Sequence, residues 1–245
     1  MNVPPAMRRR LDELRGRSVN YHVDGLDLEH PPDGWNVEDR RQTLPPESPG
    51  PAVSGGSWEI ARRLIRGYEF ADPSIVRAFY DSDEPFPGRD MLLELRALGV
   101  LRVYVGVRVN DVYDQTRTVD GRCVRVFGWS YRTLEGHVER GQMDWEVWKW
   151  IDTGEVDFHV HAVSREASIA NPLIRIGFKL LRGHERGLFL NSTDRRMAGL
   201  TELGVLGEGG EHGMREASRG LTARHLPGND PAHTALARRV GSDRG

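Results

Sequence analysis

The chain has 245 residues, and its 34 basic and 36 acidic side chains give a formal net charge of −2. This balance excludes a strong global attraction to polyanions, so we expect no binding to nucleic acid or to an anionic membrane surface. The one cysteine, Cys123, excludes an intrachain disulfide and a zinc site with several thiolates, and it fits a reducing compartment. No stretch approaches the ~20 apolar residues of a membrane span, and the first residues do not read as a signal peptide, so we expect a cytoplasmic protein.

The first part of the chain predicts one strand and two short helices. The strand covers Trp35 to Leu44, and a loop rich in proline and glycine, residues 45–56, follows it. Ser57 is placed as the N-cap of the first helix, because apolar residues recur at helical spacing after it. A second helix opens at Asp72, with Pro73 at its first helical position.

Residues 90–165 carry β-branched and aromatic runs divided by turn residues, which is typical of an antiparallel meander. Two turns predict hairpins, Val119-Asp120-Gly121 and Asp152-Thr153-Gly154, because glycine accepts the positive φ that such turns require. Five strands are expected: Met91 to Leu98 (where a helix is the alternative), Leu101 to Tyr113, Arg122 to Tyr131, Gln142 to Ile151 and Glu155 to Ser164.

Alternation along the last strands predicts which side chains share a face. Trp145 is expected to point away from Trp148 and Trp150. In the last strand, one face carries Val156, Phe158, Val160 and Ala162, and the other carries Glu155, Asp157, His159 and His161. A helix opening at Asn171-Pro172 is densely apolar, so it must lie on a hydrophobic surface; its apolar residues are Leu173, Ile174, Ile176, Phe178, Leu180 and Leu181.

The domain organisation follows from these elements. We expect an N-terminal extension over residues 1–17, one α+β domain over residues 18–197, and a disordered tail rich in glycine and arginine over residues 198–245, where no periodicity is sustained.

The most specific motif is Thr-Leu-Glu-Gly-His-Val-Glu-Arg-Gly at residues 133–141, which follows an aromatic run. With this motif, with Ala-Val-Ser-Arg at 162–165 and with Asn-Pro-Leu at 171–173, the chain resembles the uncharacterised family called domain of unknown function 1990. The proline-rich loop and the glycine-rich tail depart from that pattern. The resemblance implies no activity and no catalytic residue.

The order of elements is also similar to that of the helix-grip fold of START-like and Bet v 1-like proteins. This analogy implies a curved antiparallel sheet of about six strands wrapped around a long C-terminal helix, with an apolar cavity between them. The expected ligand-binding wall residues are Trp129, Tyr131, Trp145, Phe158, His159 and Phe178, and the alternative is that these aromatic side chains simply fill the core.

Four polar residues are candidates for chemistry. His137 and Glu139 lie between glycines in a loop that joins two strands. They would either bring an acid or base to the mouth of a cavity or only form hydrogen bonds with the loop backbone. His159 lies two residues before His161. It would either act as a base or metal ligand, or it would only face solvent or line a cavity. Arg165 would clamp an anion or form an ion pair. Two histidines without a required third ligand predict no metal site, and we expect no cofactor.

Three functions remain open at this point. The first is a noncatalytic protein that binds a small hydrophobic or amphipathic ligand between the sheet and the last helix. The second is a cyclase-like or hydrolase-like enzyme on the same fold, with His137 or His159 as base and Arg165 as anion anchor. The third is an interaction module that recruits a protein partner through the tail.

Overall fold

The computed structural model describes residues 3–21, 34–97, 101–167 and 172–207, and it describes no side chain at positions 97, 101 and 172–185. The elements follow the chain in the order α1 (Pro5–Asp12), β1 (Asn36–Leu44), α2 (Ser57–Gly67), β2 (Val76–Phe79), β3 (Asp90–Ala97), β4 (Leu101–Val119), β5 (Arg122–Thr133), β6 (Glu139–Trp150), β7 (Val156–Glu166) and α3 (Pro172–Val205).

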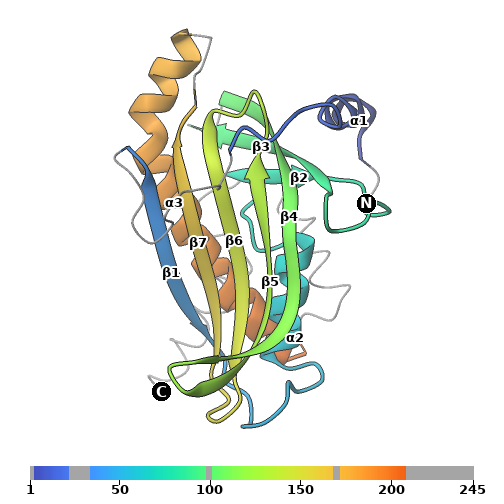
Figure 1. Cartoon of the computed structure of the whole chain (residues 1–245), viewed down its shortest axis with the longest axis vertical. Helices are drawn as coiled ribbons and strands as arrows, with labels where there is room; N and C mark the ends of the chain where they lie inside the picture. The colour runs from blue at the N-terminus through green and yellow to red at the C-terminus, as the bar shows by residue number, and fades with distance from the viewer. Residues whose placement is uncertain (1–2, 22–33, 98–100, 168–171, 208–245) are drawn as a thin grey trace, which may run out of the picture.

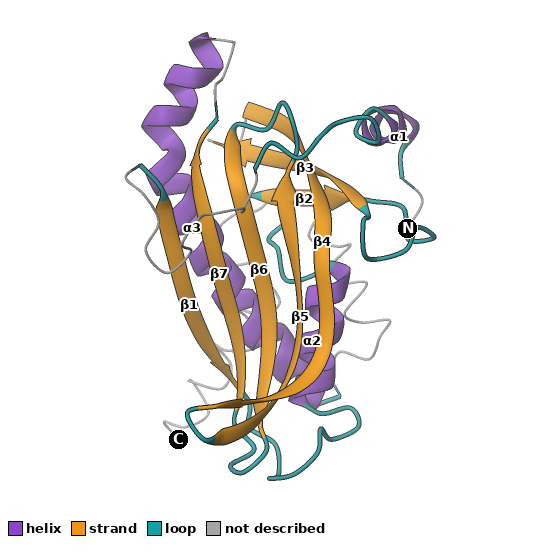
Figure 2. Cartoon of the chain, viewed as in Figure 1, coloured by secondary structure: helices purple, strands orange, loops and turns teal. Residues whose placement is uncertain are grey.

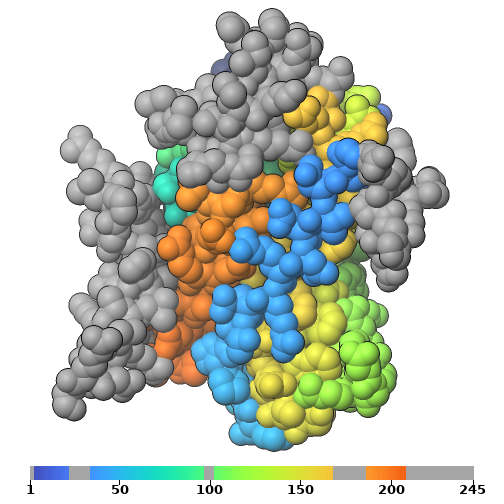
Figure 3. Space-filling view, turned by 90° about the vertical axis from the view of Figure 1, so that its left-hand side faces the viewer, coloured from blue at the N-terminus to red at the C-terminus, as the bar shows by residue number. Residues whose placement is uncertain are grey.

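The strands form one antiparallel sheet of seven strands in the order β1-β7-β6-β5-β4-β3-β2. The sheet curves, and both α2 and the long helix α3 lie behind the same face of it (Figures 1 and 2). On the β1 edge α3 runs alongside the strand (Figure 3), and Arg40 of β1 contacts Asp194 of α3 at 3.3 Å. These features confirm the predicted α+β class, a curved antiparallel sheet around a C-terminal helix.

Both predicted hairpin turns are present. Asp120 and Gly121 join β4 to β5 with φ of 51° and 76°, and Gly154 lies between β6 and β7 with φ of 79°. Left-handed backbone of this kind matches the twist of the two flanking strands, which is why these turns were recognisable.

The predicted second helix is wrong. Residues 73–75 form only a turn, in which the Asp72 carboxylate accepts hydrogen bonds from both the backbone N and the hydroxyl of Ser74. Such an Asx turn competes with helix, and Val76 then begins strand β2, which pairs with β3 and raises the strand count to seven.

Three further details compare with the sequence predictions as follows. Gly56, not Ser57, occupies the N-cap position of α2. The strand predicted from Met91 to Leu98 is confirmed as β3, and the helical alternative is wrong. Helix α3 begins at Pro172 as predicted and continues past Met197 to Val205, while the tail from residue 208 onward lies outside the described residues.

The sheet has two distinct faces, called inner and outer below. The inner face carries Trp129, Trp145 and Phe158 toward α2 and α3, and all three are fully buried. The outer face carries Asp157 and Trp148, which lie opposite each other in the register of β6 and β7. The predicted alternation along β7 is therefore confirmed.

An ion pair at one end of the inner face anchors α2. Lys149 and Glu47 are 0% and 4% exposed, and Lys149 Nζ lies 2.8 Å from Glu47 Oε2. The other carboxylate oxygen accepts a hydrogen bond from the backbone N of Trp58 at 2.7 Å. Gly154 completes the arrangement, because a Cβ there would lie 2.0 Å from the carbonyl oxygen of Glu47. The loop before α2 is thus fixed to the β6–β7 hairpin.

Replacing Lys149 should destabilise the fold strongly. Lys149→Met leaves the Glu47 carboxylate buried without its cation, so we expect the free energy of unfolding to fall by about 3–5 kcal/mol in urea titrations. The double variant Lys149→Met with Glu47→Gln removes the stranded charge and should recover part of that loss. A single variant within about 1 kcal/mol of the wild type would show that the pair does not anchor the loop.

Candidate functional site

The inner face holds a cluster of aromatic rings between the sheet and α3, which we call the inner aromatic cluster. Its centre is Trp145, whose ring is stacked on Phe158 with centroids 6.1 Å apart and meets Phe70 at 4.6 Å. Phe189 of α3 closes on Trp145 edge-on at 6.3 Å. The other members are Tyr68, Trp129 and Tyr131.

Tyr68 enters this cluster through an unusual backbone conformation. It is the C-cap of α2 with φ of 57°, a left-handed conformation that is ordinarily taken by glycine. For a bulky L residue this costs on the order of 1–2 kcal/mol. Its ring lies 4.9 Å from Phe70 and 6.1 Å from Trp145, so the strained turn is held by aromatic packing.

Two hydrogen-bond donors in the cluster are buried without a partner among the described residues. They are the Tyr68 hydroxyl and the indole N–H of Trp145. By contrast, the indole of Trp129 donates to the Ile65 carbonyl at 3.1 Å. An unsatisfied buried donor costs about 1–3 kcal/mol, so two in one cluster mark a place where an added acceptor would bind favourably.

The neighbouring phenol shares this environment. The Tyr131 hydroxyl donates to a weak acceptor, Met143 Sδ at 3.3 Å, and it also interacts with the Tyr68 hydroxyl. Burial raises the pKa of Tyr131 and also that of Tyr68 well above the ordinary tyrosine range. Both phenols therefore stay protonated and act as neutral donors at any ordinary pH.

A group of polar side chains, the polar rim, borders the cluster near Tyr131. Arg186 of α3 donates to Ser164 Oγ at 2.7 Å, and its Nε lies 3.3 Å from Glu38 Oε1. Its Nη1 is 3.9 Å from Glu139 Oε1. Arg186 and Glu139 both act electrostatically on the Tyr131 hydroxyl, which shows that the rim and the cluster adjoin.

The structure brings together four of the six predicted wall residues, Trp129, Tyr131, Trp145 and Phe158. His159 does not join them: it lies on the outer face, and alternation along β7 requires this once Phe158 points inward. The side chain of Phe178 lies outside the described residues. Tyr68 and Arg186 were not identified from the sequence, because neither is part of a motif.

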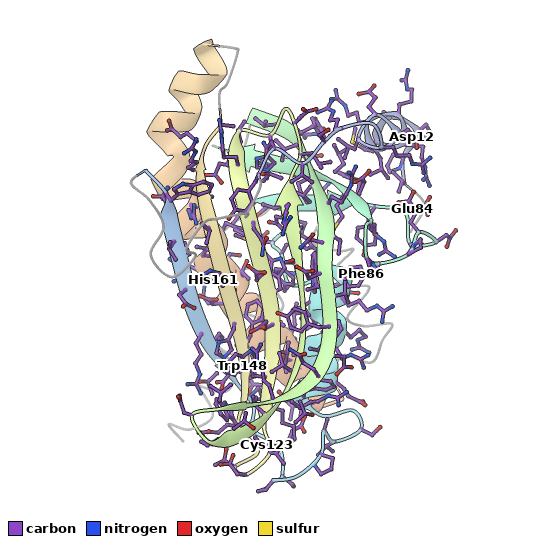
Figure 4. All side chains as sticks on the ribbon, in the orientation of Figure 1. Asp12, Glu84, Phe86, Cys123, Trp148 and His161 are labelled. Carbon is purple, nitrogen blue, oxygen red and sulfur yellow. The ribbon has the colours of Figure 1, made fainter. Side chains whose placement is uncertain are left out.

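His159 belongs instead to a network on the outer face. Its ring stacks on Trp148 at 4.2 Å, and Arg117 lies over the same indole at 4.6 Å. Trp148 donates to Glu146 Oε2 at 2.6 Å, and the Tyr113 hydroxyl donates to the other carboxylate oxygen. Figure 4 shows Trp148 and His161 on the side of the sheet turned away from α3.

The four catalytic candidates do not converge among the described contacts. His137 accepts a hydrogen bond at Nδ1 from the backbone N of Glu139 at 2.9 Å, and burial lowers its pKa to about 4. Arg165 lies over the outer-face ring of Trp35 at 5.1 Å. Glu139 faces Arg186, and His159 stacks on Trp148. In the described part of the chain no group of three or more His, Cys, Asp or Glu side chains is placed to hold a metal ion.

Comparison with known proteins gives one family and a set of structural likenesses. The model described as "Domain of unknown function (DUF1990)" matches residues 20–186. No curated protein matches the chain. No described helix has both the length and the apolar character needed to span a bilayer.

The chain is also similar to several solved structures, and three of them follow. A norcoclaurine synthase point mutant from Thalictrum, in complex with a transition-state analogue, has a TM-score of 0.44 at 10% identity, over 72% of this chain and 97% of that one. The Zhui aromatase/cyclase from Streptomyces has a TM-score of 0.42 at 12% sequence identity, and the match covers 71% of this chain and 99% of that one. A major latex-like protein from Panax ginseng has a TM-score of 0.41 at 10% sequence identity, and the match covers 67% of this chain and 96% of that one.

The unpartnered Tyr68 hydroxyl makes a prediction about stability. Tyr68→Phe keeps the ring and removes only an unsatisfied buried group, so we expect the unfolding free energy to stay equal or rise by up to about 1 kcal/mol. Tyr80→Phe is the matched control, because the Tyr80 hydroxyl donates to the Gly67 carbonyl at 2.9 Å; it should lose about 1 kcal/mol. Equal losses in both variants, measured by urea unfolding, would show that the Tyr68 hydroxyl has a structural partner.

Asp144 on the outer face makes a prediction about pH. Burial raises the pKa of its carboxyl from 3.8 to about 6, so the folded state favours the protonated form and ionisation destabilises it as the pH rises through that interval. The stability of Asp144→Asn relative to the wild type should therefore increase over this pH range and level off above it. Urea unfolding at several pH values measures this difference.

Asp152 provides the control of opposite sign. The Arg122 guanidinium holds the pKa of the Asp152 carboxyl below its usual range, so the folded state favours the ionised form. Asp152→Asn should therefore lose stability relative to the wild type as the pH rises through the acid range. A flat difference for Asp144→Asn would contradict the assignment of a raised pKa to that carboxyl.

Proposed function

The chain belongs to the family described as domain of unknown function DUF1990, and we propose that it binds a small amphipathic molecule between its sheet and α3. The apolar part of the guest lies against the inner aromatic cluster, and an acceptor atom of the guest faces Tyr68, Tyr131 and Trp145. In this proposal the protein acts in the cytoplasm as a binding protein, with residues 18–197 as the binding domain.

One observation carries the proposal. Trp145 Nε1 lacks a partner among the described residues, and the Tyr68 hydroxyl has only the neighbouring Tyr131 phenol as a polar contact there. Buried polar groups in proteins are almost always hydrogen-bonded, so exceptions require an explanation. A guest with an acceptor supplies the missing partner, and sites for small molecules have this composition, mostly apolar with a few placed polar groups.

The strained turn at Tyr68 supports the same proposal. Left-handed backbone at bulky residues persists only where the surroundings enforce it, and it is found preferentially at ligand-binding sites. Here the strain directs one phenol into the same cluster as Tyr131. The enzymatic alternative lacks comparable support, because the described contacts of His159 and Arg165 are on the outer face.

The test uses prodan, a neutral naphthyl ketone dye whose emission reports both an apolar environment and hydrogen bonding to its carbonyl. We expect saturable binding with a shift of the emission to the blue. The double variant Tyr68→Phe with Tyr131→Phe should weaken the affinity by about threefold to tenfold, the value of one hydrogen bond or slightly more.

Tyr113→Phe is the control, because it removes a phenol hydroxyl from the outer face, where Tyr113 donates to Glu146. It should leave the affinity for prodan unchanged. An absence of saturable binding by the wild type, or an equal loss in Tyr113→Phe, would exclude the inner aromatic cluster as the site. Native mass spectrometry of the purified protein would then show whether a copurified molecule already fills it.

A further inference from the structure

We propose that Met143 is a site of oxidation by hydroperoxides and that its sulfoxide closes the binding site beside it. In this step the thioether sulfur takes one oxygen atom as the O–O bond breaks, and the hydroperoxide leaves as water or an alcohol. The sulfoxide oxygen then accepts the hydrogen bond of Tyr131 in place of the guest. The oxidation follows from the contacts of Met143 itself, and its effect on binding rests on the proposed function.

Met143 lies at the edge of the inner aromatic cluster. In the register of the sheet it is opposite Tyr131 of β5 and Ala162 of β7. Its side chain packs against the core and is only half-buried, and the Tyr131 hydroxyl donates to its Sδ at 3.3 Å. Part of this side chain therefore contacts water, where a small hydroperoxide has access to it.

Burial separates Met143 from other methionines of the chain. Met91 and Met197 are 2% and 0% exposed, so an oxidant in solution is kept away from them. Met7 of α1 is half-buried like Met143, but it packs against the apolar cluster that contains Leu11. Among the described residues no side chain donates a hydrogen bond to Met7. Met143 therefore combines access with a donor that is aimed at its sulfur.

That donor changes the consequence of oxidation. A sulfoxide usually disrupts a core, because it turns an apolar side chain into a polar one. At Met143 the new oxygen meets the Tyr131 hydroxyl, which has only the weak sulfur acceptor in the unmodified protein. The methionine side chain is unbranched and flexible, so the sulfur is able to shift while the oxygen takes the place beside the phenol. The fold should therefore tolerate this sulfoxide.

The oxidised side chain competes with the guest for one donor. In the proposed function an acceptor atom of the guest faces Tyr131, together with Tyr68 and Trp145. The Tyr68 hydroxyl interacts with that of Tyr131, so a sulfoxide that holds Tyr131 also affects the neighbouring phenol. The loss of one hydrogen bond to the guest corresponds to an affinity about threefold to tenfold weaker.

The first experiment tests the oxidation without any dye. Full-length protein is treated with dilute hydrogen peroxide, and peptide mass spectrometry follows the sulfoxide at each methionine. Met143 should react about tenfold faster than Met91 and Met197, because susceptibility follows exposure. Peroxide should also lower the urea midpoint of Tyr131→Phe more than that of the double variant Tyr131→Phe with Met143→Leu, whereas the wild type and Met143→Leu should respond alike. A Met143 as slow as Met91, or an equal response in the Tyr131→Phe pair, would overturn the inference.

The second experiment tests the closing of the site. Met143→Gln supplies a permanent acceptor beside Tyr131, and Met143→Leu keeps a similar volume without one. Met143→Gln should bind prodan about threefold to tenfold more weakly than Met143→Leu, the value of one hydrogen bond. This difference should vanish when both are made in Tyr131→Phe. Peroxide should weaken binding in the wild type by a similar factor and leave Met143→Leu at its own untreated affinity.

Met7→Leu is the control, because Met7 lies on α1, away from the inner aromatic cluster. It should match the wild type both in affinity and in its response to peroxide. If the Gln and Leu variants at position 143 bind prodan equally, the inference is overturned and the proposed function stands. If the wild type does not bind prodan, the proposed function and the closing of the site both fail, while the first experiment still decides whether Tyr131 holds a sulfoxide at Met143.

Discussion

The buried ion pair between Lys149 and Glu47 is the contact on which the geometry of the candidate site depends. Glu47 joins three parts of the fold: its carboxylate binds Lys149 of β6 and the backbone N of Trp58 at the start of α2, and its carbonyl oxygen lies against Gly154. The start of α2 is thereby fixed relative to the sheet. Because a helix is stiff, this also fixes its other end, where Tyr68 leaves α2 in a left-handed turn. A charge pair at one end of the inner face thus positions a phenol at its centre.

The outer face of the sheet carries a polar network centred on one carboxylate, whereas the inner face is lined mostly by aromatic rings. On the outer face the Tyr113 hydroxyl, the Trp148 indole and the Arg117 guanidinium all bind the carboxylate of Glu146. Gly128 permits this network, because a Cβ there would lie 2.6 Å from the Tyr113 ring. The network is not complete, because Nε2 of His159 and Nε of Arg117 are buried without a hydrogen-bond partner among the described residues. On the inner face, comparable donors are buried among aromatic rings without equivalent acceptors.

The sequence predicted the parts of this architecture that local physics controls. Period-two alternation separated Trp145 from Trp148 within one strand and Phe158 from His159 within the next, and glycine at 121 and 154 marked both hairpins. The second helix failed because the Asx turn at Asp72 and the pairing of β2 with β3 outweighed a local helix signal. His159 was assigned to the ligand wall although its own alternation places it opposite Phe158. That error came from grouping residues by chemistry instead of by face.

The site itself could be predicted only in part, because its decisive features are contacts between distant segments. Tyr68 is an ordinary aromatic residue after Gly67 in the sequence, and its left-handed conformation arises only when α2 is held on the sheet. Arg186 follows a long apolar pattern in α3, and nothing local indicates that it meets Glu38 and Ser164, which come from two other elements. A fold with a net stability of about 5–15 kcal/mol retains strain and unsatisfied donors only where packing offsets them. The aromatic rings around Tyr68 and Trp145 provide that packing, since each such ring buries roughly 150–250 Å². The inner aromatic cluster is thus tightly packed and still incomplete in hydrogen bonding among the described residues, and the proposed binding of an acceptor group starts from this combination.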